Sequence, residues 1–175
     1  MAVIERDDHA ALGGRATIGE SAGMDMNRRY LLAGLGAFAV TSPAAAAPKQ
    51  AITVHKDANC GCCSVWAERM TATGRYAPKL INQPDMVAVK TRLRVPPELA
   101  SCHTTQVGTY VVEGHVPPSA VDRLLREKPK GVIGLAVPGM PAGSPGMEMP
   151  DGRREAYDIY AFTADGRSRV FARIA

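Results

Sequence analysis

Residues 51–74 read AITVHKDANCGCCSVWAERMTATG, and the segment predicts a β-strand, a turn and an α-helix in succession. The strand is predicted over Ala51–Lys56, where β-branched residues alternate with polar ones. The cysteine-rich turn DANCGCC follows, and then a helix over Cys63–Gly74 that the glycine ends. Three of the chain's four cysteines therefore fall where a strand passes into a helix.

The rest of the chain alternates between strand and helix patterns. Strands are predicted over Tyr76–Asn82, Thr105–Gly114 and Val132–Val137, and helices over Asp85–Leu93 and in PPSAVDRLLREKPKG. A loop rich in Gly, Pro and Met, Pro138–Glu155, precedes a hairpin around Asp165 and Gly166. These patterns predict an α/β fold with a mixed sheet, flanking helices and a C-terminal β-hairpin. The order of strand, cysteine turn and helix resembles that of thioredoxin.

The spacing of Cys60 and Cys63 is that of a redox-active C-x-x-C pair at a helix N-terminus. The helix dipole and the free backbone N–H groups there favour thiolate. Here Cys62 adds a third sulfur between them, and three thiolates in one turn repel one another. A disulfide or a metal ion must therefore bridge or neutralise them.

Both solutions stay open at this point. A Cys60–Cys63 disulfide is easy at such a turn and leaves Cys62 and Cys102 to pair with each other, so that two ordinary structural disulfides are one interpretation. The alternative function is a thiol–disulfide oxidoreductase that uses Cys60 and Cys63, with Cys62 and Cys102 as resolving cysteines. The same four sulfurs are also enough for one structural zinc ion, or for a soft ion such as Cu(I).

Further soft or borderline ligands favour copper among the metals. The candidates are His103, His115, Met140, Met147 and Met149. Thioether sulfur is a good ligand for Cu(I), and a Gly/Pro-rich loop offers these methionines no evident packing partner. The competing interpretation is that the methionines hold the loop down as hydrophobic contacts. His103 and Cys102 are neighbours, so they can reach one ion only where the backbone departs from a regular strand.

The N-terminal region predicts export. Residues 26–47 have the layout of a secretory signal peptide: Arg28 and Arg29, an apolar run over Leu31–Val40, and then small residues. The run is about ten residues long, shorter than the roughly 20 needed to span a bilayer, and the paired arginines resemble a twin-arginine signal. A membrane anchor or a buried helix is the alternative. Residues 1–25 are either a disordered leader or lie upstream of the true start.

The predicted mature domain, residues 48–175, contains all four cysteines. It carries 17 Lys and Arg against 12 Asp and Glu, without a long basic run, and has few aromatic residues. This composition does not indicate nucleic-acid binding. A domain of this size buries a sufficient core without disulfides, which leaves the cysteines free for chemistry.

Four separated blocks resemble one bacterial family: CGCC, ASCHT, YVVEGHVP and GLAVPGMPAGSPGME. This is the CopG-type family of exported copper proteins, found in copper-resistance gene clusters, and the likeness extends over Ile52–Ile174. The resemblance implies a thioredoxin-like fold and a multinuclear copper–sulfur cluster held by Cys60, Cys62, Cys63 and Cys102. It also implies a role in periplasmic copper handling, which includes a change of copper between its two oxidation states.

Together these observations predict a periplasmic copper-binding protein for copper resistance, in which binding is favoured over an enzymatic role as copper oxidoreductase. The four cysteines are the expected Cu(I) ligands, and His103, His115 and the loop methionines are candidate outer or exchange ligands. Expected partners are copper ions together with periplasmic copper chaperones or efflux proteins, and the mature chain is not expected to span a membrane.

Overall fold

The structure is a computed structural model that describes residues 48–175, so the predicted leader and signal peptide lie outside the described residues. The elements follow the chain in the order β1 (Gln50–Lys56), α1 (Gly61–Ala72), β2 (Tyr76–Asn82), α2 (Met86–Arg92), η1 (Pro97–Leu99), β3 (His103–Val107), β4 (Tyr110–Glu113), α3 (Pro118–Glu127), β5 (Val132–Ala136), β6 (Tyr157–Thr163) and β7 (Ser168–Ile174). The element η1 is a single 3₁₀ turn.

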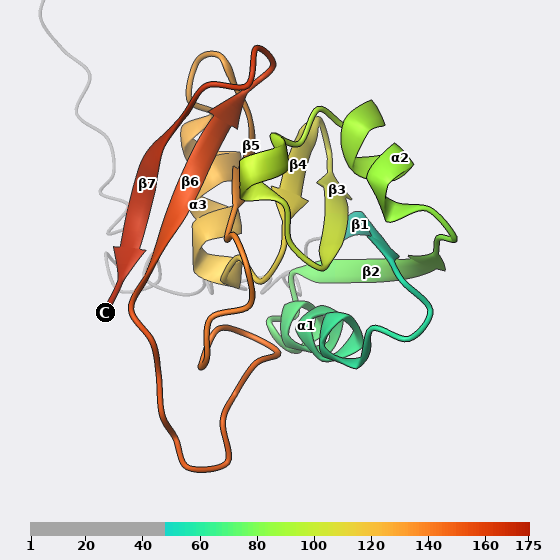
Figure 1. The fold of residues 1–175 in the computed structure, drawn as a ribbon, viewed down its shortest axis with the longest axis vertical. Coiled ribbons are helices and arrows are strands. Elements are labelled where there is room, and N and C mark those ends of the chain that lie inside the picture. Colours follow the sequence, from blue (N-terminus) through green and yellow to red (C-terminus); the bar gives the residue numbers. More distant parts are fainter. Residues whose placement is uncertain (1–47) are drawn as a thin grey trace, which may run out of the picture. The chain divides into compact units, whose positions relative to one another are not determined.

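The strands of the described residues form one sheet in the order β2-β1-β3-β4-β5-β6-β7 (Figure 1). Strand β1 runs parallel to β2, and β4 runs parallel to β5. The other neighbours are antiparallel, including the C-terminal hairpin of β6 and β7. The predicted mixed α/β sheet and its C-terminal hairpin are therefore confirmed, and the thioredoxin-like arrangement stays a prediction.

Neighbouring residues of a strand point to opposite faces of the sheet. Each face of this sheet has its own apolar core. Val112 of β4 and Leu135 of β5 pair in register and belong to the larger core, which includes residues of α1 and α3. Val111 and Ala136 belong to a smaller core on the other face, together with Leu99 of η1. Helices α1 and α3 therefore cover one face, and the segment around η1 covers the other.

The prediction of one strand over Thr105–Gly114 is wrong, because the chain reverses direction inside this segment. Strands β3 and β4 form an antiparallel hairpin in which Val107 pairs with Tyr110. Gly108 lies in the turn with a φ of 58°, which glycine adopts without steric cost. The reversal returns the C-terminal end of β4 to the first residues of β3.

Helices α2 and α3 begin where local sequence signals place them. Asp85 caps α2 with its carboxylate, and Pro118 occupies the first position of α3, where its missing N–H costs nothing. Helix α1 begins at Gly61, two residues before the predicted start, so that Cys62 joins Cys63 in the first turn. None of the helices that the structure describes is long and apolar enough to cross a membrane.

Candidate metal centre

Four segments of the chain meet at one edge of the sheet. Strand β1 ends at Lys56, which pairs with His103 at the start of the antiparallel β3. Strand β4 returns and ends at Glu113, and the parallel β5 ends beside it at Ala136. The segments that leave or enter the sheet at this edge are the cysteine turn, the Cys102 segment, the His115 segment and the Pro138–Glu155 loop.

The cysteine turn is held in place before α1 begins. Cys60 is the N-cap residue of α1, and its N–H donates to the backbone oxygen of Asp57 at 3.1 Å. The buried ammonium of Lys56 also donates to that oxygen, at 2.8 Å. Cys62 and Cys63 lie in the first turn of α1. The unpaired N–H groups and the dipole of this turn place partial positive charge beside this end of the helix.

The four sulfur atoms converge. The Sγ atoms of Cys60, Cys62, Cys63 and Cys102 all lie within 4.8 Å of one another; we call these residues the cysteine cluster. Two sulfurs bound to one tetrahedral ion lie about 3.8 Å apart, given metal–sulfur bonds of about 2.3 Å. The spacing therefore fits metal binding by all four. In this structure Cys60 and Cys63 form a disulfide, while Cys62 and Cys102 are free thiols, so a four-thiolate site requires reduction of that disulfide.

His115 meets the cysteine cluster through Cys102. Its Nε2 lies 3.0 Å from the sulfur of Cys102, and its Nδ1 lies 2.7 Å from the backbone oxygen of Pro145. A carbonyl oxygen only accepts, so Nδ1 carries the proton and donates to it. This fixes Nε2 as the nitrogen with the free lone pair, which is the form in which histidine binds metals.

His103 also approaches Cys102, although the two residues are neighbours in the chain. Its Nδ1 lies 3.4 Å from the Cys102 sulfur, and the ligand atoms of Cys102, His103 and His115 all lie within 4.8 Å of one another. This is geometrically feasible because Cys102 precedes β3 and does not share its alternation. The His103 ring lies against Trp66 at a centroid distance of 4.6 Å, and its buried Nε2 has no hydrogen-bond partner within the described part of the chain.

The protonation states of Cys102, His103 and His115 in the metal-free protein are compatible with metal binding. Burial, with a smaller contribution from the nearby Cys62, raises the pKa of the Cys102 thiol to about 12. The metal-free Cys102 is therefore a thiol at neutral pH, and its S–H donates to Nε2 of His115. Burial lowers the pKa of His103, and the neighbouring His115 lowers it further. Burial also lowers the pKa of His115, against the opposing effect of the Pro145 carbonyl. Both imidazoles are thus neutral, as ligands must be.

The Pro138–Glu155 loop packs directly on the first turns of α1. Gly146 has a φ of 87°, and a Cβ built at this position would lie 2.9 Å from the backbone oxygen of Cys62 and 2.8 Å from the backbone nitrogen of Trp66. Arg69 of α1 and Glu148 of the loop form an ion pair at 2.8 Å. The loop is therefore held beside the cysteine cluster by close backbone contact and by charge.

The loop methionines differ in exposure. Met140 is 51% exposed, which argues against a role as a buried hydrophobic contact. Met147 and Met149 are half-buried, so that both the packing interpretation and the ligand interpretation fit them. The ligand role of all three stays a prediction. His55 is buried and has both ring nitrogens within hydrogen-bond distance of glutamines, so packing accounts for it.

Sequence reasoning missed one charged group beside the site. The carboxylate of Glu113 is buried and lies within hydrogen-bond distance of Lys90, Ser101 and Thr104. Burial raises the pKa of Glu113, and Lys90 opposes this rise. The available signal in the sequence was a charged residue, Glu113, at the end of the otherwise largely apolar strand YVVE.

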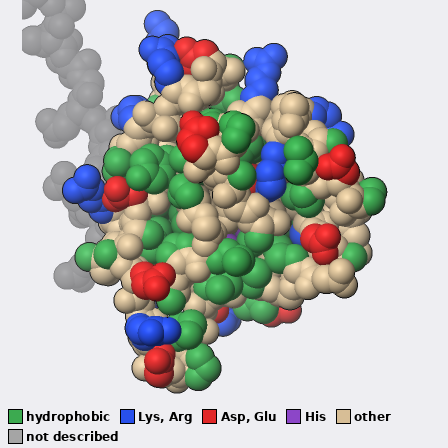
Figure 2. All heavy atoms as spheres, in the orientation of Figure 1, with side chains coloured by type: hydrophobic (Ala, Val, Ile, Leu, Met, Phe, Trp, Pro, Cys, Tyr) green, Lys and Arg blue, Asp and Glu red, His purple; other side chains and the backbone are tan. Residues whose placement is uncertain are grey.

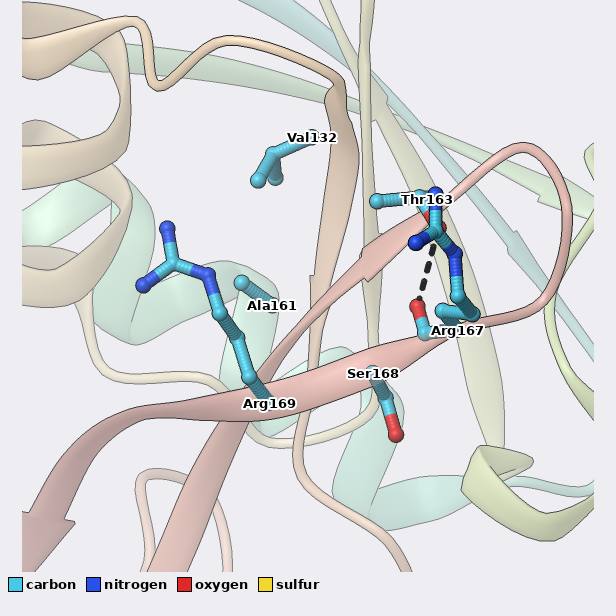
Figure 3. A pocket seen from close by; sticks show the side chains of 6 residues that line it. All are labelled: Val132, Ala161, Thr163, Arg167, Ser168 and Arg169. Carbon is cyan, nitrogen blue, oxygen red and sulfur yellow. Dashed lines mark hydrogen bonds between the residues drawn. The ribbon is translucent and has the colours of Figure 1, made fainter.

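Cavities elsewhere in the described residues are less suited to a metal. A cavity of about 290 Å³ is lined by Val132, Ala161, Thr163, Arg167, Ser168 and Arg169 (Figure 3). It lies at the opposite ends of β5 and β6 from the cysteine cluster, and its cationic lining disfavours a metal ion. Histidine is almost hidden on the molecular face shown in Figure 2, in keeping with the burial of His55, His103 and His115.

Comparisons with known proteins give a consistent result. The family model described as "Protein of unknown function, DUF411" matches residues 99–147. No curated protein sequence matches the chain. Two solved structures of the copper resistance protein CopG, form 1 and form 2, are 43% and 44% identical, with TM-scores of 0.67 and 0.66. Each match covers 73% of this chain, and 98% and 100% of the respective CopG chain. The chain belongs to the CopG-type copper resistance family.

Proposed function

We propose that this chain is a periplasmic copper-binding protein for copper resistance, and that it binds Cu(I) through a multinuclear thiolate cluster. One observation carries the proposal: the sulfurs of four cysteines, from two separate segments of the chain, lie within 4.8 Å of one another. The similarity to two structures of a copper resistance protein supports copper as the metal. Thiolate sulfur is also the ligand that selects Cu(I).

Charge balance favours more than one ion. Four thiolates around a single Cu(I) ion leave a net charge of about −3, which the half-buried site accommodates poorly. Thiolates that bridge several Cu(I) ions share their charge among those ions, and the N-terminus of α1 offsets part of the remainder. Nε2 of His115 and Nδ1 of His103 lie close enough to the Cys102 sulfur to act as additional ligands, and Met140, Met147 and Met149 are candidate exchange ligands.

The proposed location and partners rest on separate observations. The signal-peptide layout of residues 26–47 and the Cys60–Cys63 disulfide both support an oxidising, extracytoplasmic compartment. In that compartment the protein would take copper from, or pass it to, periplasmic copper chaperones or efflux proteins. A change of the bound copper between Cu(I) and Cu(II) is part of the proposal, and electron paramagnetic resonance before and after air oxidation tests it.

Cu(I) titration of the reduced chain tests the binding itself. Residues 48–175 are reduced without air and titrated in competition with a coloured Cu(I) chelator. We expect more than one copper ion per chain by elemental analysis, and loss of this stoichiometry in Cys102→Ser. Retention of at most one tightly bound zinc ion, with no copper held against the chelator, would favour a structural zinc module instead.

The disulfide favours one second candidate, a thiol–disulfide oxidoreductase that uses Cys60 and Cys63. This pair is already oxidised at the N-terminus of α1, and the sulfur of Cys62 lies 3.6 Å from that of Cys60. The metal-free protein would then reduce insulin catalytically with a thiol donor, and Cys60→Ser would abolish turnover. Turnover no faster than that of the donor alone would exclude this function.

A further inference from the structure

Glu113 binds both sides of the Cys102–His103 segment. Its Oε1 accepts the backbone N–H of Ser101 at 2.6 Å, and its Oε2 accepts the hydroxyl of Thr104 at 2.7 Å. Ser101 and Thr104 directly precede and follow Cys102 and His103 in the chain. One buried carboxylate on β4 therefore holds both ends of the segment that carries the Cys102 sulfur.

Lys90 of α2 completes the arrangement from the other side. Its ammonium lies 2.5 Å from Oε1 of Glu113 and 3.0 Å from the hydroxyl of Thr104. The Glu113 side chain is completely buried, and that of Lys90 is 14% exposed. A buried ion pair is costly to desolvate and adds little stability over an apolar pair of the same size. Fold stability alone is therefore a weak reason for its presence.

The site supplies a stronger reason. Cys102 lies outside regular secondary structure, so no ladder of strand hydrogen bonds fixes its backbone. Its sulfur must nevertheless lie within a few ångströms of three sulfurs on another segment and of Nε2 of His115. The backbone on its N-terminal side is fixed by Ser101, whose N–H is bound by Glu113 and whose hydroxyl donates to the oxygen of Gly139 at 2.5 Å.

We propose that Glu113, supported by Lys90, is a positioning residue that holds the Ser101 N–H and thereby places the Cys102 sulfur in the cysteine cluster. The inference rests on the proposed function, since a placed sulfur has value only where a metal binds it. Glu113 is not expected to touch the metal. It acts through its carboxylate oxygen, which accepts the hydrogen bond from the Ser101 N–H.

Paired substitutions separate this role from a structural one. Lys90→Met with Glu113→Leu replaces the ion pair by apolar side chains, which is expected to preserve the fold but removes the acceptor for Ser101. Lys90→Met with Glu113→Gln restores an amide oxygen as acceptor. Tyr76→Phe is the control, because it removes a side-chain hydrogen bond to Asp122 in another part of the fold.

Two readouts are measured on each variant. The first is the alkylation rate of Cys102 in the reduced, metal-free protein, followed by mass spectrometry, and the second is the apparent Cu(I) affinity. In the leucine variant we expect Cys102 to react about tenfold faster and Cu(I) affinity to fall about tenfold, the equivalent of one lost hydrogen bond. The glutamine variant should recover most of both losses, and the control should change neither.

Wild-type values of both readouts in a folded leucine variant would overturn the inference. So would a glutamine variant that is folded but no better than the leucine variant. If the leucine variant does not fold, Glu113→Asp serves in its place: it keeps the charge beside Lys90 and withdraws the carboxylate from Ser101. Unchanged alkylation of Cys102 in Glu113→Asp would equally contradict the proposal. The alkylation rate needs no copper, so a wild-type chain that binds none refutes the proposed function while the positioning test still stands.

Discussion

The sulfur of Cys102 lies 3.0 Å from Nε2 of His115, 13 residues further along the chain. The contact exists because β3 and β4 form a hairpin that returns His115 to the point where Cys102 precedes β3. The second nitrogen of His115 is fixed by the oxygen of Pro145. Strand pairing and the loop together therefore present one imidazole to the cysteine cluster.

His115→Ala should weaken Cu(I) binding while the cysteines still bind. Loss of one ligand nitrogen is expected to lower the apparent affinity about tenfold or more, as the loss of a strong polar contact does. The matched control is His55→Ala, another buried histidine in the same domain whose ring bonds only to glutamines. Chelator competition measures both. A His115→Ala protein with wild-type affinity would remove His115 from the site.

Gly146→Ala should lift the Pro138–Glu155 loop from α1. A methyl group there would lie 2.8 Å from the nitrogen of Trp66, and the φ of 87° adds strain. Gly152→Ala is the control, because Gly152 has a φ of 71° but no atom within 4 Å of the added carbon. Backbone strain of about 1 kcal/mol is common to both variants.

Only Gly146→Ala should also weaken copper retention, because the loop carries the Pro145 oxygen that orients His115. Urea denaturation measures the strain, and Cu(I) competition measures the site. Equal effects of the two alanines in both assays would show that the loop contact does not support the site.

Reduction should change the number of reactive thiols from two to four. Cys62 and Cys102 are free in the structure, whereas Cys60 and Cys63 share a disulfide. A colorimetric thiol count on denatured protein should therefore give two before reduction and four after it. Only the four-thiol form should hold several copper ions. Equal copper loading of both forms would show that Cys60 and Cys63 are not required.

Stability should fall above pH 10 through Tyr76. Burial raises the pKa of Tyr76, and its hydrogen bond to Asp122 raises it further. In the unfolded chain a tyrosine ionises near pH 10, while the folded state keeps its proton. The unfolded state alone then releases a proton as the pH rises, and stability falls by about 1.4 kcal/mol per pH unit.

Tyr76→Phe removes the part of the pH-dependent loss of stability that comes from ionisation of Tyr76. Urea denaturation between pH 8 and 11 should give the variant a flatter decline than the wild type. Tyr157→Phe is a necessary comparison, because burial raises the pKa of Tyr157 as well. Parallel curves for wild type and Tyr76→Phe would contradict the assignment to Tyr76.

Local patterns predicted much of the fold. The alternation of Ala51–Lys56 and the helix that follows the cysteines were sufficient to predict β1 and α1. The Gly108 turn was missed, because β-branched and aromatic residues continue on both sides of it and a single glycine is a weak signal. The convergence of Cys102 with the cysteine turn was expected from the family resemblance. The spacing of the cysteines along the chain does not predict this convergence. It depends on the antiparallel pairing of β1 and β3, which are far apart in the sequence.

The supporting groups around the site were harder to predict than the ligands. Glu113 stands in a strand whose other residues are mostly apolar, and its role depends on Lys90 from α2 and on Ser101. Gly146 is one of several glycines in its loop, and only its distance to α1 distinguishes it. Such contacts arise from tertiary packing and leave no periodic trace in the sequence.

The proposed function requires that four thiolates hold Cu(I) together. The most direct measurement is the copper count per chain, by elemental analysis after gel filtration without air, for reduced wild type, Cys102→Ser and Cys60→Ser. We expect more than one copper ion in the wild type and loss of that stoichiometry in both variants. A wild type that retains no copper, or variants that retain as much as the wild type, would contradict it.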